Sequence, residues 1–122
     1  MEADAYDLYR SAQRLIEERE VSAAVPLLEQ AALQLPDEPA ILRLLALAHY
    51  GSASFTAAES LLRRLVADDP LDADSLHMLG EILELTGRSE QSRRYYALAG
   101  HLTPAYAVSC RTWGGERTPE QA

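Results

Sequence analysis

The residues best suited to chemistry by type and spacing lie in DDPLDADS, residues 68–75, where four aspartates surround a proline. Alternating carboxylates are what a calcium-binding loop supplies, but such a loop also needs a glycine and a distal glutamate. After Asp72 and Asp74 the next alternating position is Leu76, and His77 stands where the glycine belongs. We therefore predict no metal site and interpret the segment as the bend between two helices.

The histidines and the cysteine form no catalytic pattern. His49, His77 and His101 lie far apart in the sequence, and none has a second histidine or a cysteine at metal-ligand spacing. The sequence has neither a G-x-S-x-G nucleophile motif nor a glycine-rich phosphate loop. Cys110 falls at a position where we expect burial, and buried structural thiols are inert. We predict a protein that is not an enzyme and needs no cofactor.

The charge of the chain restricts its partners. A formal net charge of −8 argues against nucleic acid and anionic membrane surfaces. Residues 1–38 carry nine acidic residues against three arginines, so the negative field is an N-terminal feature. The chain has no lysine, which is typical of a GC-rich bacterial genome. No secretory signal is visible, and no stretch approaches the roughly 20 apolar residues of a membrane span. We expect a cytoplasmic bacterial protein.

A regular period runs along the chain, since Pro36, Pro70 and Pro104 are 34 positions apart. It divides the sequence into repeats 5–38, 39–72 and 73–106. Five positions of the repeat hold apolar or small residues in all three copies. They are Leu8, Leu42 and Leu76; Ala12, Ala46 and Gly80; Ala24, Ala58 and Ser92; Leu28, Leu62 and Tyr96; and Ala31, Leu65 and Ala99. Such a period predicts stacked units with a common core.

Each repeat is predicted to form two helices. Apolar residues recur at i, i+3, i+4 and i+7 on both sides of a break, and a proline closes the second helix because it cannot continue it. Asp4, Glu38 and Asp72 occupy N-cap positions of first helices. Gly87 suits the left-handed conformation that ends a first helix. The segment Thr56–Glu59 has the spacing of a capping box and predicts the start of a second helix.

This pattern resembles the tetratricopeptide repeat (TPR) family, whose helix–turn–helix unit has this length. The matching residues are Leu45-Ala46, Phe55, Ala58 and Pro70 in the second repeat, and Leu79-Gly80, Tyr96, Ala99 and Pro104 in the third. The first repeat matches less well, since Ser11 stands where leucine is usual and Pro26 falls in the first turns of its second helix.

The resemblance implies an all-α fold, a right-handed α-solenoid of three helix–turn–helix repeats with about seven helices including a cap. We expect the domain to span residues 1–113. Its capping helix, at about 105–113, would cover the third repeat with Cys110 and Trp113, because solenoid ends need a cap. Residues 114–122 are expected to be a flexible tail.

The resemblance also implies a concave groove lined by the first helix of each repeat, where members of this family bind partners. The expected groove residues are Tyr6, Tyr9, Arg10, Gln13, Arg43, Leu44, Leu47, Tyr50, Asp74, His77, Met78, Glu81 and Glu84. Chaperone-binding members grip a terminal carboxylate with a clamp of lysine, asparagine and arginine. The clamp positions here hold Tyr9, Gln13, Leu44, Asp74 and Met78, so an EEVD-type peptide is not expected.

Two classes of function remain open. The first is an adaptor that binds a peptide or helix of a partner protein through apolar anchors, with a basic residue facing Glu81 and Glu84. The second is a structural protein that self-associates into a homodimer or larger assembly, since exposed apolar patches often mark self-association. A small chaperone of a secretion apparatus is a special case of the first, which no residue specifically selects.

Overall fold

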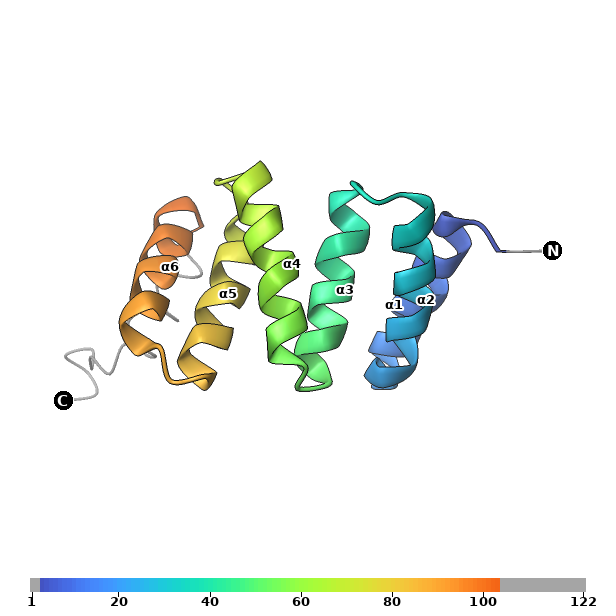
Figure 1. Cartoon of the computed structure of the whole chain (residues 1–122), viewed down its shortest axis with the longest axis horizontal. Helices are drawn as coiled ribbons and strands as arrows, with labels where there is room; N and C mark the ends of the chain where they lie inside the picture. The colour runs from blue at the N-terminus through green and yellow to red at the C-terminus, as the bar shows by residue number, and fades with distance from the viewer. Residues whose placement is uncertain (1–2, 104–122) are drawn as a thin grey trace. The chain divides into compact units, whose positions relative to one another are not determined.

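The computed structural model describes residues 3–103, which form six helices (Figure 1). These are α1 (Ala5–Glu17), α2 (Val21–Gln34), α3 (Pro39–Gly51), α4 (Phe55–Asp68), α5 (Ala73–Leu85) and α6 (Ser89–Leu102). The first and last residues of each helix recur one repeat length later in the next helix pair, so the helices alternate between 13 and 14 residues. The predicted all-α class and its three helix pairs are confirmed. The seventh helix expected at about 105–113 and the tail over 114–122 lie outside the described residues.

The five aligned positions of the repeat supply much of the core. All fifteen residues at these positions are buried. The small ones are needed for close approach of paired helices. At Gly80, for example, an added Cβ would lie 2.9 Å from Cδ1 of Tyr96 on the facing helix. The period therefore predicted these buried side chains correctly. Their removal from water stabilises each helix pair.

Carboxylates cap the three first helices, as predicted. Asp4 accepts a hydrogen bond from the backbone amide of Asp7 at 2.8 Å. The equivalent residues Glu38 and Asp72 accept from amides two and three residues further on, at 3.4 and 3.3 Å. Each bond satisfies an amide that has no partner within its helix, and the carboxylate lies at the favourable end of the helix dipole.

The acidic segment 68–75 contains the bend between α4 and α5, and two of its carboxylates accept hydrogen bonds from backbone amides. Asp69 accepts from the amide of Leu71 at 3.1 Å, and Asp72 accepts from both the amide and the hydroxyl of Ser75. Within residues 3–103, no three histidine, cysteine or acidic side chains are placed to share a metal ion. The role of Asp69, which the sequence did not explain, is to fix the turn.

The capping box predicted at Thr56–Glu59 is wrong. Helix α4 begins at Phe55, so Thr56 already lies inside it. Glu59 instead accepts from Nε of Arg63 at 2.9 Å, one turn further along the helix. The spacing misled because residues three apart also face each other within a helix.

One turn geometry ends all three first helices. Arg19, Ala53 and Gly87 occupy the same position of successive repeats and have φ of 66°, 61° and 82°. The amide of each donates to the carbonyl three residues earlier, and the next amide donates to the carbonyl five residues earlier. This is the hydrogen-bond pattern of a left-handed helix end. The prediction for Gly87 is confirmed, and the same conformation is imposed on an arginine and an alanine.

The chain divides into two compact units, with the boundary after Leu65 in α4. In the first unit α1 packs against α2, and α2 packs against α3. The buried residues of its two core clusters are Ala12, Ala24, Leu28, Leu45 and Ala48, and Ala5, Leu8, Ala31 and Ile41. In the second unit α5 packs along α6. Among the helices described, none has the length and apolar character needed to cross a membrane.

Candidate functional site

The first helix, α1, presents a face on which aromatic and polar side chains alternate. Tyr6 is 65% exposed, and the guanidinium of Arg10 lies 5.5 Å from its ring centroid. Tyr9 is half-buried and packs against both core clusters of the first unit, whereas Gln13 is exposed. This face therefore keeps one aromatic ring in solvent and anchors a second one in the core.

Helix α3 continues this face with mainly apolar residues. Leu47 is exposed, while Arg43, Leu44 and Tyr50 are half-buried. Leu44 packs against the core, and the Tyr50 ring meets the Phe55 ring edge-on at 5.9 Å. Tyr50 therefore has a packing role at the α3–α4 turn. Of the two predicted leucines on α3, Leu47 is more accessible than Leu44.

An apolar hollow of about 270 Å³ lies between the starts of α1 and α3. It is lined by Ala5, Tyr6, Tyr9, Leu35, Glu38, Ala40 and Ile41. Ala5 and Ile41 are buried and form its floor, whereas Tyr6 and Leu35, 65% and 47% exposed, form its rim. We call it the α1–α3 hollow. Its lining is mostly apolar, with Glu38 as the one charged residue among those that line it.

Helix α5, in the second unit, carries the remaining five predicted site residues; three of them are acidic, and four are partly buried. Asp74 is exposed, and Met78 is half-buried. Nδ1 of His77 lies 3.0 Å from Oε1 of Glu81, and its ring lies 5.3 Å from that of Tyr96. With 14% of its side chain exposed, His77 is largely a packing residue held between an acid and an aromatic ring.

Glu84, also on α5, differs from its neighbour Glu81. Its Oε2 atom is buried and has no hydrogen-bond partner in the described part of the chain. Burying a carboxylate oxygen without a partner is costly. Glu84 is therefore the acidic residue of α5 with the most to gain from a cationic group.

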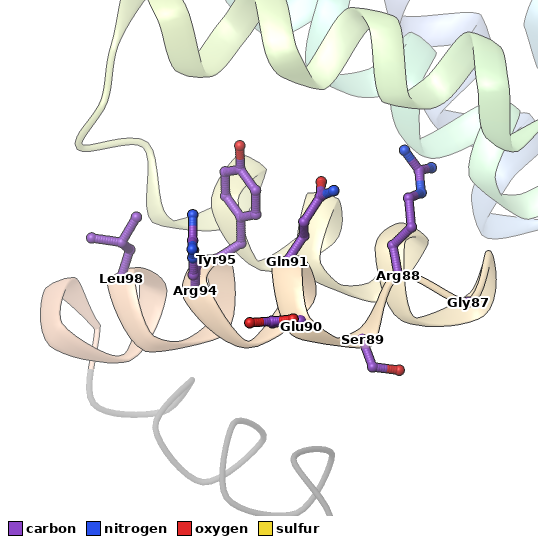
Figure 2. Close-up of a pocket in the computed structure, with 8 residues that line it drawn as sticks. All are labelled: Gly87, Arg88, Ser89, Glu90, Gln91, Arg94, Tyr95 and Leu98. Carbon is purple, nitrogen blue, oxygen red and sulfur yellow. The ribbon is translucent and has the colours of Figure 1, made fainter.

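A second hollow runs along α6 (Figure 2). Arg88, Gln91 and Tyr95 point to one side of the helix, and Ser89 points to the other. Arg88 donates from Nε and Nη2 to the hydroxyl of Thr86 at 3.3 and 3.0 Å, so it helps to fix the α5–α6 turn. This hollow mixes polar and apolar groups and is built largely from one helix, whereas binding pockets are usually enclosed by several elements.

Sequence reasoning found part of the α1–α3 hollow and missed the rest. Tyr6 and Tyr9 were predicted from the face of the first helix. Leu35, Glu38 and Ile41 were missed because Leu35 and Glu38 precede α3 and the buried Ile41 projects to its core side. A comparison of the repeats contains a signal for them: one repeat length later, Leu35 and Ile41 are replaced by aspartate and serine.

Comparison with known proteins gives a consistent result for the fold. A model of the tetratricopeptide repeat family matches residues 15–83, more than half of the chain. No curated protein matches the sequence. The crystal structure of MamA superposes with a TM-score of 0.83 at 16% identity and covers 91% of this chain. The chain spans 64% of that protein, and 55% of a MamA structure from Desulfovibrio magneticus RS-1.

Two further structures have similar folds. The first TPR domain of Spaghetti (RPAP3), bound to the HSP90 peptide SRMEEVD, superposes with a TM-score of 0.81 at 17% identity, and 89% of each chain is covered. An O-GlcNAc transferase mutant from Thermobaculum terrenum gives a TM-score of 0.80 at 25% identity, covering 96% of this chain and 24% of the enzyme. At such low identities, the likeness to MamA and to the Spaghetti domain shows the fold alone.

Proposed function

The chain belongs to the tetratricopeptide repeat family, and from that premise we propose that it is a non-enzymatic adaptor that binds a peptide or helix of another protein on the face of its first helices. The adaptor acts in the cytoplasm and uses no cofactor. A secretion chaperone would be one specific form of this activity.

The observation that carries the proposal is the apolar surface of α1 and α3. Tyr6 and Leu47 are exposed, and Tyr9 and Leu44 are half-buried beside them. Helices α1 and α3, both in the first unit, thus each contribute apolar surface. Polar groups on α1, such as Arg10 and Gln13, can fix a ligand's orientation. A partner segment with apolar anchors would remove this area from water.

The ligand we propose differs from the acidic peptide bound by the Spaghetti domain. The positions of a carboxylate clamp hold Tyr9, Gln13, Leu44, Asp74 and Met78 in this chain. None of these side chains is cationic, and Asp74 would repel a terminal carboxylate. The acidic residues of α5 instead favour a partner with basic residues.

The test is partner capture with single substitutions on exposed residues. Tyr6→Glu and Leu47→Glu place a charge on the face without entering the core. Leu33→Glu is the matched control, because Leu33 on α2 is 82% exposed and outside the face. We expect partners recovered from lysate by the unaltered chain to be lost with both face variants and retained with the control. Retention of the same partners by all three variants would refute the proposal.

Self-association is the second candidate function, favoured by exposed leucines outside this face. Leu33, Leu71 and Leu85 are 82, 70 and 57% exposed. Such residues lie at the contacts of many assemblies. Sedimentation velocity at micromolar concentration distinguishes the two candidates, since a monomer across the concentration range excludes an assembly.

A further inference from the structure

The α1–α3 hollow is apolar although the repeat does not require it to be. The residues one repeat length after Tyr9, Leu35, Ala40 and Ile41 are Arg43, Asp69, Asp74 and Ser75. The second and third repeats build the same helices and turns with these polar residues. Folding therefore tolerates polar side chains at these positions. Tyr9 and Ile41 also pack in the core of the first unit, but Leu35 is 47% exposed, so its apolar side chain calls for another explanation.

The dimensions of the hollow suit one side chain. Its volume of about 270 Å³ lies below the range of about 300–1,000 Å³ typical of small-molecule pockets. Ala5 and Ile41 close it from below, and the exposed Tyr6 and Leu35 stand at its edge. An inserted leucine, phenylalanine or methionine would contact the floor and cover the exposed rim.

The charges around the hollow are mainly negative. Glu38 lines it, and its carboxylate lies 3.4 Å from the amide of Ala40. The exposed carboxylates of Asp4 and Asp7 flank Ala5 and Tyr6 in the sequence. Two positive groups lie nearby: Arg10 lies over the Tyr6 ring, and Arg64 donates to the carbonyl of Pro36 and pairs with Asp37. Residues 1–38 as a whole carry nine acids against three arginines. A cationic neighbour of the inserted side chain would be attracted.

We propose that the α1–α3 hollow binds one bulky apolar side chain of a partner segment whose adjacent residues are lysine or arginine. This inference rests on the proposed function and adds the chemistry of the partner. The apolar side chain supplies most of the affinity, because its burial removes it and the rim from water. The basic neighbours supply a salt-sensitive preference for the correct segment.

The experiment begins with an unbiased probe. A phage-displayed library of random dodecapeptides is selected against the full chain, and the enriched peptides are synthesised with a fluorophore for anisotropy titrations. We expect enrichment of a large apolar residue next to lysine or arginine. Replacing that residue with alanine should weaken binding about ten-fold or more, since burial of such a side chain is worth roughly 1.5–3 kcal/mol.

Three variants and one control locate the binding site. Ala40→Phe fills the hollow without changing charge, and Leu35→Ser removes part of the rim. Each substitution should lower the affinity for the selected peptides about ten-fold. Glu38→Gln keeps an oxygen for the helix cap. It should weaken peptide binding about three-fold at low salt and less at high salt. Leu33→Ser, at an exposed leucine away from the hollow, should have no effect. Circular dichroism verifies that each variant is folded.

The outcomes separate this inference from the proposed function. If enriched peptides are acidic, or if they tolerate Ala40→Phe and Leu35→Ser but are lost with Leu47→Glu, the inference is wrong and the proposed function stands. If no peptide is enriched, or none responds to any variant of the α1 and α3 face, both fail. If the unaltered chain sediments as an assembly that Ala40→Phe dissociates, the occupant is a second copy, which also overturns the inference.

Discussion

The first and third helix pairs solve the same packing problem with different residues. In the first pair, α1 contributes Ala12 and α2 contributes Leu28, and both are buried. Where α5 meets α6, Gly80 faces Tyr96, and an added Cβ would lie 2.9 Å from the ring. The repeat therefore conserves the combined volume of the two positions, since a larger side chain on one helix requires a smaller one on the other.

The difference extends to the candidate site. The Tyr96 ring also lies 5.3 Å from that of His77, which in turn contacts Glu81. The equivalent of His77 in the first repeat is Tyr9, which lines the α1–α3 hollow. One position of the repeat thus holds a histidine paired with an acid in one copy and a tyrosine that lines a hollow in another, so a role cannot be transferred between repeats from its position alone.

The largest expected effect comes from breaking the glycine–tyrosine match. Gly80→Ala should lower the free energy of unfolding by about 2–3 kcal/mol, because the methyl group overlaps the Tyr96 ring. Adding Tyr96→Leu recreates the alanine–leucine pair of the other repeats. The double variant should therefore be more stable than the sum of the two single effects by at least about 1 kcal/mol. Urea unfolding measures all four proteins, and strict additivity would contradict the volume argument.

A smaller effect distinguishes the second helices. Pro26 lies inside α2, and the equivalent residues of the second and third repeats are serine and arginine. Proline within a helix costs about 3 kcal/mol relative to alanine, offset by up to about 1 kcal/mol from the stiffer unfolded chain. Pro26→Ala should therefore stabilise the protein by about 2 kcal/mol. Hydrogen exchange followed by mass spectrometry should show slower exchange in α2 and little change in α5 and α6.

The smallest effects concern the three matching turns. Arg19 and Ala53 have positive φ where the third repeat has Gly87. A left-handed conformation costs a residue with a Cβ about 1 kcal/mol relative to glycine. Ala53→Gly should raise the unfolding free energy by about 1 kcal/mol, and Gly87→Ala should lower it by a similar amount. Paired thermal and urea unfolding tests this, and equal signs for the two substitutions would exclude it.

The part of the site that the sequence predicted follows from helical geometry. Spacing along α1 and α3 identified Tyr6, Tyr9 and Leu47 as surface residues beside the core. It did not identify Leu35 or Ile41, because the α1–α3 hollow joins residues that are distant in the sequence. Nor did it reveal that His77 is held by Glu81 and Tyr96, since helical spacing gives the direction of a side chain but not the size of the residue facing it.

What the sequence by itself determined was the period, and with it the six helices in residues 3–103, the caps of the three first helices, and the buried columns. These features are local, because a repeat of fixed length sets where each helix begins and ends and which of its sides is apolar. Tertiary structure alone decided which face residues stay accessible, where the α1–α3 hollow forms, and that Arg19 and Ala53 adopt a glycine-like conformation. Those outcomes depend on contacts between helices and on turns whose geometry is imposed by packing on both sides.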